Sequence, residues 1–214
     1  GAYLRGDEIV FRRDGNDTVL LHRRDIGLRG EHNLENVLAA ASAAYLAGAQ
    51  PAAIASGVRS FAGVEHRLEF VAEIGGASYY NDSKATNVDA TLKAIDAFPG
   101  RLLLILGGKD KGSDYTLLRE ALEEKALVAY VIGAAAEKIV GQISGAVEIE
   151  RAETLDRAVQ LAAERATSGD TILLAPACAS FDQFENYEHR GRVFKQLVRQ
   201  IEQKAASRAP AGKR

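Results

Sequence analysis

Three short segments of the chain combine the residue types that bind small acidic or phosphorylated ligands. The first covers residues 81–87 and contains Asp82, Lys84 and Thr86. A carboxylate, an ammonium group and a hydroxyl so close together suit an anionic or amine-bearing ligand, because they can both donate and accept hydrogen bonds. A second interpretation stays open, since Thr86 and Asp89 also stand at the spacing of a helix capping box.

The second segment covers residues 107–112 and reads Gly-Gly-Lys-Asp-Lys-Gly, directly after an apolar run that ends at Leu106. Glycines let the backbone turn sharply and approach a ligand closely. Lys109 and Lys111 provide positive charges for a carboxylate or a phosphate. The alternative interpretation is a solvated loop between a strand and a helix.

The third segment covers residues 175–184 and consists largely of small residues. Such residues leave backbone N–H groups accessible, and Ser180 can donate a hydrogen bond to a carboxylate. Cys178 is the single cysteine of the chain, and no histidine stands at a telling spacing from it. We therefore interpret Cys178 as a buried structural thiol and not as a nucleophile.

Two further pairs lie upstream of these segments. Asn33 and Asn36 are three residues apart, which places both amides on one face of a helix, where they could contact an adenine edge. Asn33 could equally be a helix N-cap. Arg67 follows His66 and can fork onto phosphate oxygens, although an ordinary surface arginine is the alternative.

Several classes of site and protein are not expected. The four histidines do not stand at zinc-ligand spacing from cysteine or carboxylates, and no G-x-x-x-x-G-K-[ST] sequence is present. A formal charge of −2 without a basic run before the tail argues against nucleic-acid binding. The apolar stretches are too short for a membrane span. One cysteine excludes an internal disulfide and fits a reducing compartment, and residues 1–17 lack the apolar core of a secretion signal.

The elements that must position these residues fall into two groups. Residues 8–12 and 18–22 are β-favouring and flank turn residues, which predicts an antiparallel hairpin. Apolar periodicity predicts a helix from Asn33 to Gly48, and a second helix runs from Pro51 to Phe61. Residues 63–67 are interpreted as a linker.

From residue 68 onward, predicted strands and helices alternate. The strands are expected at 68–73, 78–80, 101–106, 127–132, 147–149 and 171–175, and the helices at 88–98, 114–123 with Asp114 as N-cap, 134–143, 153–166 and 190–203. Strands that are apolar on both faces predict a mostly parallel sheet with helices on both faces, a Rossmann-like α/β fold. Ligands bind at the carboxyl ends of such strands, so we expect the three segments to share one rim.

In their order and spacing, these segments resemble the motifs of the Mur ligase family. The motifs are Gly30-Glu31-His32-Asn33 with Asn36, then His66-Arg67, residues 81–87, residues 107–112, residues 177–184, and Arg190-Gly191. The resemblance extends over residues 30–200. The Asp-Ser-Lys-Ala-Thr-Asn segment is most similar to members that add D-glutamate to UDP-N-acetylmuramoyl-L-alanine.

The resemblance implies a domain organisation. Residues 1–66 would be the C-terminal part of a P-loop ATPase-type central domain, residues 67–205 a Rossmann-like amino-acid-binding domain, and residues 206–214 a disordered tail. The UDP-binding domain, the P-loop and the Mg²⁺ ligands would lie upstream. The absence of methionine from the chain agrees with a fragment. Without the P-loop and the UDP-binding domain, we expect that fragment to be inactive alone. Closure between the domains would use residues 63–68 as a hinge.

The resemblance also implies an activity and its residues. ATP would phosphorylate the carboxylate of UDP-N-acetylmuramoyl-L-alanine, and D-glutamate would attack the acyl phosphate, in a cytoplasmic, monomeric enzyme of peptidoglycan synthesis. In the implied site, Asn33 and Asn36 contact adenine, Arg67 and Asp82 contact the phosphate and ribose of ATP, and Lys84, Thr86, Lys111, Ser180, Phe181 and Tyr187 bind D-glutamate. Lys84, Lys111 and Arg67 are the expected catalytic residues, and Tyr187 stands where relatives often carry Phe.

Two alternatives stay open from the sequence. The first is a related ATP-dependent ligase, either another Mur ligase or a folylpolyglutamate synthetase. The second is a non-catalytic module that binds a nucleotide or an acidic ligand.

Overall fold

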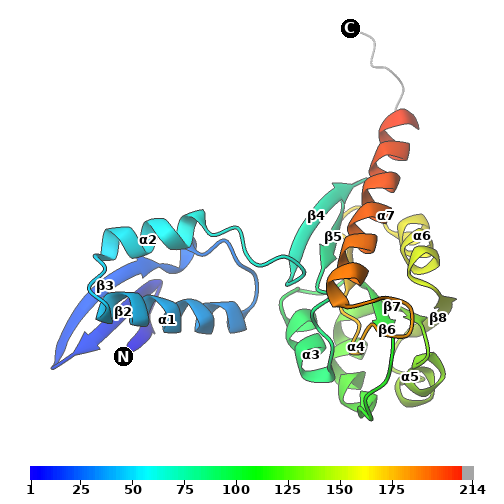
Figure 1. Ribbon diagram of the computed structural model, residues 1–214, viewed down its shortest axis with the longest axis horizontal. Coiled ribbons are helices and arrows are strands. Elements are labelled where there is room, and N and C mark those ends of the chain that lie inside the picture. Colours follow the sequence, from blue (N-terminus) through cyan, green and yellow to red (C-terminus); the bar gives the residue numbers. More distant parts are fainter. Residues whose placement is uncertain (209–214) are drawn as a thin grey trace, which may run out of the picture. The chain divides into compact units, whose positions relative to one another are not determined.

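The computed structural model describes residues 1–208, in two compact units that meet between Val64 and Glu65 (Figure 1). This division lies within the predicted linker, two residues before the predicted domain boundary. Residues 206–208 of the predicted tail belong to the last helix, and residues 209–214 lie outside the described part of the chain. Within residues 1–208, no helix has both the length and the apolar composition to cross a membrane.

The first unit packs two helices on a three-stranded antiparallel sheet. Its elements are β1 (Ala2–Arg5), β2 (Glu8–Arg13), β3 (Asn16–His22), the 3₁₀ helix η1 (Arg23–Asp25), α1 (Glu31–Leu46) and α2 (Pro51–Ser60). The predicted hairpin is β2–β3, whereas β1 was not predicted. The helix start predicted at Asn33 is wrong. Gly30 is the N-cap, and its carbonyl oxygen accepts from the N–H group of Asn33.

The second unit is an α/β domain with one six-stranded sheet. Its elements are β4 (Glu69–Ile74), β5 (Ala77–Asn81), α3 (Val88–Asp96), β6 (Leu102–Gly107), η2 (Tyr115–Leu118), α4 (Arg119–Lys125), β7 (Ala126–Ile132), α5 (Ala136–Ile143), β8 (Glu148–Glu153), α6 (Leu155–Arg165), β9 (Thr171–Leu174) and α7 (Tyr187–Arg208). The strand order is β4-β5-β9-β6-β7-β8, in which only β4 is antiparallel to its neighbour. The predicted mostly parallel sheet is confirmed.

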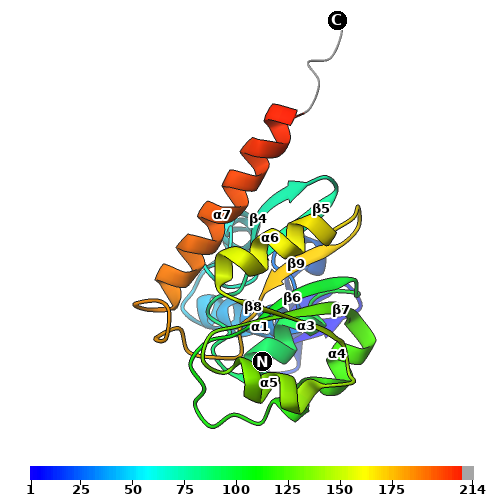
Figure 2. The same cartoon turned by 90° about the vertical axis from the view of Figure 1, so that its right-hand side faces the viewer.

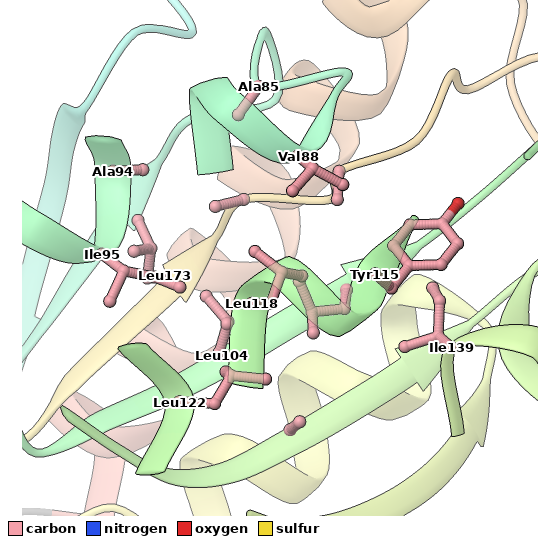
Figure 3. Packing of buried hydrophobic residues seen from close by; sticks show 14 of the residues in the cluster. Ala85, Val88, Ala94, Ile95, Leu104, Tyr115, Leu118, Leu122, Ile139 and Leu173 are labelled. Atoms are coloured by element: carbon pink, nitrogen blue, oxygen red, sulfur yellow. The ribbon is translucent and has the colours of Figure 1, made fainter. Parts of the chain in front are cut away.

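Helices cover both faces of this sheet, as predicted (Figure 2). One face packs against α3, η2, α4 and α5, and the other against α6 and α7. Figure 3 shows the first of these cores, where Leu104 and Leu173 of the sheet meet Ile95, Leu118 and Leu122. β6 is buried over its whole length, which is why its sequence is apolar without alternation.

Some helix boundaries differ from the predicted ones. α3 begins at Val88, as predicted, and ends two residues early, and the alternative interpretation of Thr86 and Asp89 as its capping box is wrong. Its N-cap is Asn87, whose side-chain oxygen accepts from the N–H group of Ala90 at 2.8 Å. Asp114 is an N-cap as predicted, but of the short η2. The last helix begins at Tyr187, three residues before the predicted start.

Strand order brings the three polar segments together at one rim. β9 lies between β5 and β6, so the segment after β9 is flanked by the segments after the other two strands. Lys109 and Ala179 exchange backbone hydrogen bonds of 2.8 and 3.2 Å. Gly108 has a φ of 136°, and a Cβ there would collide with the carbonyl oxygen of Ala179. Glycine therefore permits this close approach of two loops.

Arg190 of α7 forms hydrogen bonds to both the segment after β5 and the segment after β9. Its side chain is completely buried. The guanidinium donates to the hydroxyl and carbonyl oxygens of Ser83 at 3.0 and 2.8 Å, and to the carbonyl oxygen of Cys178 at 3.2 Å. Burial lowers the pKa of Arg190 to about 10, so the group stays charged at neutral pH and its hydrogen bonds are charge-assisted.

We expect Arg190→Lys to lower the free energy of unfolding of the second unit by about 3 kcal/mol, because one ammonium cannot reach all these oxygens and leaves buried acceptors unpaired. Urea unfolding followed by the NMR signal of Leu104 measures this loss. Arg192→Lys, at an exposed neighbouring position, is the matched control and should change stability by no more than about 0.5 kcal/mol. Equal losses in the two variants would contradict the clamping role of Arg190.

Candidate ligand-binding site

The segment after β5 has a buried base and exposed tips. Asn81, Asp82 and Ser83 are buried, whereas Lys84 is exposed and Thr86 is half-buried. The base is fixed by backbone hydrogen bonds, such as that from Asp82 N–H to the carbonyl oxygen of Leu174 at 2.8 Å. The two side chains predicted to bind an amino acid therefore project from a rigid support.

Asp82 and Arg67, which were predicted to act on the same ligand, lie close together. Burial raises the pKa of Asp82 to about 6, although a hydrogen bond from the Leu68 N–H group and the positive charge of Arg67 both favour the ionised form. Arg67 itself is exposed. An exposed guanidinium beside a buried carboxylate can contact an anionic group and a hydroxyl of one ligand.

Lys84 and Tyr187 also come together, from segments far apart in sequence. The Lys84 ammonium lies 5.5 Å from the centre of the Tyr187 ring, at cation–π distance. The Ser83 hydroxyl donates to the Tyr187 carbonyl oxygen at 2.7 Å. Tyr187 is only partly exposed, so its ring limits the directions that Lys84 can take.

In the segment after β6, Asp110 holds the loop and the lysines remain exposed. Its carboxylate accepts from Lys138 and from the Tyr115 hydroxyl, both at 2.8 Å. The bond from Lys138 is the main cause that keeps the pKa of Asp110 well below its ordinary value. Lys109 and Lys111 are exposed, so the loop presents positive charge at the rim.

The segment after β9 pairs a buried serine with an exposed aromatic ring. Ser180 is buried, and its carbonyl oxygen accepts from the N–H groups of Gln183 and Phe184, which makes a tight turn. Phe181 is 65% exposed. Burial raises the pKa of the Cys178 thiol, and this thiol lies 2.9 Å from the Tyr115 hydroxyl. Cys178 is thus a buried, neutral thiol that packs below the rim, which agrees with its interpretation as a structural residue and not a nucleophile.

Asn33 and Asn36 belong to the first unit. They lie on one face of α1, where Asn36 donates to the side-chain oxygen of Asn33 at 3.3 Å. Asn33 also donates to the carbonyl oxygen of Arg29 at 2.7 Å. The predicted pairing of the two amides is present, and the outward amide of Asn36 is exposed.

One hollow beside the rim does not involve the residues predicted to bind an amino acid. A surface cavity of about 380 Å³ lies past the ends of β7 and β8, with Gly133, Glu137, Arg151 and Asp182 in its lining. Its lining contains none of the side chains predicted to bind an amino acid. We favour the rim over this cavity as the ligand site, because the rim presents exposed cations and a hydroxyl on fixed loops.

Sequence reasoning missed one cluster at the start of the second unit. The His66 ring lies 3.7 Å from a Glu65 oxygen and 3.8 Å from a Glu69 oxygen. The expectation that the histidines stand apart from carboxylates is therefore wrong for His66, and the Glu-His-x-x-Glu order was the available signal. Ligand atoms of these three residues lie within 4.8 Å of one another, as in a metal site. However, Lys195 pairs with both glutamates, at 2.5 and 2.9 Å, and so provides the positive charge.

The raised pKa of Asp82 predicts a pH effect on stability. A raised pKa means that the folded state binds the proton more tightly than the unfolded state, whose aspartate titrates near 4. The protonated carboxyl group of Asp82 therefore stabilises the folded state relative to its ionised form. This contribution is fully present below about pH 4 and is lost as the pH rises through about 6. An asparagine side chain cannot ionise, so the free energy of unfolding of Asp82→Asn should rise relative to that of the wild type as the pH increases. We expect this relative rise to be on the order of 2 kcal/mol between low pH and a pH above about 6. Urea unfolding at several pH values measures it, and an NMR titration midpoint near 4 for Asp82 would contradict it.

Comparison with known proteins agrees with the motifs. The family model "Mur ligase, glutamate ligase domain" matches residues 66–178, just over half of the chain. A curated relative from Solibacter usitatus, named UDP-N-acetylmuramoylalanine–D-glutamate ligase, is 60% identical over 204 residues, which are 95% of this chain and 45% of that protein. A relative of the same name from Acidobacterium capsulatum is 58% identical over 200 residues, 92% of this chain and 43% of that protein. The chain thus spans less than half the length of these relatives.

Solved structures share the fold at low identity. A pseudomurein peptide ligase type C from Methanothermus fervidus superposes with a TM-score of 0.67 at 18% identity, covering 92% of this chain and 41% of that one. A folylpolyglutamate synthase from Mycobacterium tuberculosis gives a TM-score of 0.60 at 17% identity, covering 89% and 44%. With the family match over the α/β unit and the close curated relatives, these findings identify the chain as a member of the Mur ligase family.

Proposed function

We propose that the protein to which this chain belongs is an ATP-dependent ligase that adds D-glutamate to UDP-N-acetylmuramoyl-L-alanine in peptidoglycan synthesis. The observation that carries this proposal is the rim of the second unit, where segments after β5, β6 and β9 present exposed lysines beside a hydroxyl-bearing loop. Relatives with 58% and 60% identity bear the name of such a ligase.

The proposed chemistry needs charge neutralisation and a correctly held amine. The γ-phosphoryl group of ATP is transferred to the substrate carboxylate, which gives an acyl phosphate. The D-glutamate amine then attacks the acyl carbon with its lone pair, phosphate leaves, and the amine loses a proton. Positioned cations stabilise the charge that develops in both steps. Mg²⁺, which would neutralise phosphate charge, is expected to be bound by residues outside this chain.

Side chains of the rim would hold D-glutamate by both carboxylates. Lys111 and Ser180 are the proposed carboxylate contacts, because an ammonium group and a hydroxyl are both donors. Lys84 and Thr86 would contact the amino acid from the segment after β5, with Tyr187 directing Lys84. Phe181, largely exposed, would cover the ligand and exclude water.

The nucleotide contacts are proposed for both units. Asn33 and Asn36 of the first unit would contact adenine, and Arg67 and Asp82 of the second would contact phosphate and ribose. Residues 1–66 would then belong to the central ATP-binding domain, with residues 63–68 as the hinge. A chain without the remaining parts would be inactive alone, and the complete enzyme is proposed to be a cytoplasmic monomer that acts on small molecules.

An amino-acid screen with the complete enzyme tests this proposal. The purified protein is given ATP, Mg²⁺ and UDP-N-acetylmuramoyl-L-alanine with D-glutamate, L-glutamate, L-alanine or diaminopimelate, and the product is identified by mass spectrometry. We expect incorporation of D-glutamate alone. Incorporation of another amino acid instead would assign a different ligase of the family, and binding without product formation would favour a non-catalytic module.

Lys111→Ala should raise the KM for D-glutamate at least about tenfold, since a charge-assisted hydrogen bond to a carboxylate contributes about 1.5–3 kcal/mol. The KM for ATP should change much less. Steady-state kinetics of the complete enzyme measures both constants. Lys109→Ala is the matched control, because Lys109 is an exposed lysine of the same loop with no proposed ligand contact. Equal effects of Lys111→Ala on the two KM values would contradict the role.

A further inference from the structure

Arg67 sits between two residues with an unusual backbone conformation. His66 has a φ of 66° and Leu68 a φ of 42°. Residues other than glycine rarely adopt these left-handed conformations, and they persist only where the surrounding structure holds them. Such strain often marks a functional site, and the contacts that maintain it here come from three separate elements.

Hydrogen bonds fix the turn on both sides of Arg67. The His66 N–H group donates to a Glu69 carboxylate oxygen at 3.0 Å, and the His66 carbonyl oxygen accepts from the Lys84 N–H group at 3.1 Å. The Leu68 N–H group donates to the Asp82 carboxylate. The same turn therefore connects the start of β4 to the segment that carries Asp82 and Lys84.

The imidazole of His66 anchors the turn inside the protein. It is 3% exposed, and its Nδ1 lies 2.9 Å from the amide nitrogen of Asn81. That amide nitrogen also donates to Glu69 at 3.0 Å, while the Asn81 oxygen accepts from the Ser83 N–H group. Both contacts fix the amide orientation, so His66 Nδ1 must be the acceptor and the ring is neutral. Burial, which lowers the pKa of His66, favours the same state.

Gly191 of α7 provides the space for this ring. A Cβ at position 191 would lie 2.9 Å or less from three atoms of the His66 imidazole. Glycine inside a helix is less favourable than alanine, so its presence in α7 requires a reason. The close approach of His66 is that reason.

Lys195, one helical turn further along α7, ties down the flanks of the turn. Its ammonium group lies 2.5 Å from a Glu65 oxygen and 2.9 Å from a Glu69 oxygen. Glu65 directly precedes His66, and Glu69 follows it by three residues. α7 thus holds residues 65–69 in two ways: Lys195 pairs with the two glutamates, and Gly191 packs against the imidazole of His66.

We propose that His66, seated between Asn81 and Gly191, is a positioning residue that holds the left-handed turn presenting Arg67 beside Asp82. This inference rests on the proposed function for the ligand, since Arg67 is there the contact to ATP phosphate. His66 acts through Arg67 and touches no ligand itself.

Amide hydrogen exchange of the 214-residue chain tests the positioning directly. The exchange rate of Leu68, divided by that of the core residue Ile105, reports local opening of the turn. We expect this ratio to rise at least about tenfold in His66→Ala and in Gly191→Ala. Gly191→Ala removes no polar group and introduces a better helix former, so it tests the contact even if His66→Ala does not fold. An unchanged ratio in Gly191→Ala would overturn the proposal.

Asp170→Asn is the matched control for loss of a buried polar contact. Asp170 is 3% exposed and accepts from Thr167 at 2.8 Å, before β9 and thus at the opposite end of the sheet from the rim. This variant should leave the ratio of Leu68 to Ile105 exchange unchanged. A comparable rise in the control would mean that any destabilisation opens the turn, and would also overturn the proposal.

Kinetics of the complete enzyme gives the second readout. His66→Ala and Gly191→Ala should raise the KM for ATP several-fold and leave the KM for D-glutamate nearly unchanged. In an Arg67→Ala background, either change should have no further effect, because both act through that arginine. Additive losses would contradict the positioning role. A wild-type enzyme that does not incorporate D-glutamate would instead contradict the proposed function, and Leu68 exchange would still decide the role of His66.

Discussion

The rim of the α/β unit depends on one buried cation. The Arg190 guanidinium donates to oxygens of Ser83 and Cys178, which come from two different loops of the rim. A buried charge is costly unless its N–H groups are bonded, so the fold gains from these contacts only when both segments are in place. The guanidinium thereby couples the loop after β5 to the loop after β9, and Gly108 brings the loop after β6 against the same pair.

The first part of α7 extends this coupling to the start of the domain. Tyr187 faces Lys84 and His66, Gly191 faces His66, and Lys195 pairs with two glutamates. The same helix is fixed to the sheet by its apolar face, which includes Phe194 and Val198. A change in the seating of α7 on the sheet must therefore move the proposed amino-acid site and the proposed phosphate contact together.

The sequence predicted those parts of the structure that local patterns determine. Unbroken apolar runs such as 102–106 indicated the buried strands, and the carboxyl-end rule for parallel sheets placed the three polar segments at one rim. The helix ends were missed by a few residues because the local capping signals compete, as at Asn87 and Thr86, whereas the larger misses arise from contacts between distant residues. The ring of His66 fits against Gly191, and the side chain of Ser83 meets Arg190, 107 residues away. Neither periodicity nor spacing reports such contacts, and the left-handed conformation of His66 exists only because of them.

The backbone of the rim segments is fixed, whereas several of their side chains are exposed, and this difference determines how the rim could bind a ligand. The backbone of all three segments is held by bonds to buried groups, whereas Lys84, Lys111 and Phe181 are exposed. Binding a small amino acid would then require ordering of a few side chains and not of whole loops, which keeps the entropic cost low. The fixed backbone also sets the direction from which an amine can approach, and orientation of this kind can supply a large part of the rate enhancement in a ligase. The hydrogen bonds that fix the base of the rim thus also provide the rigidity that the proposed chemistry needs.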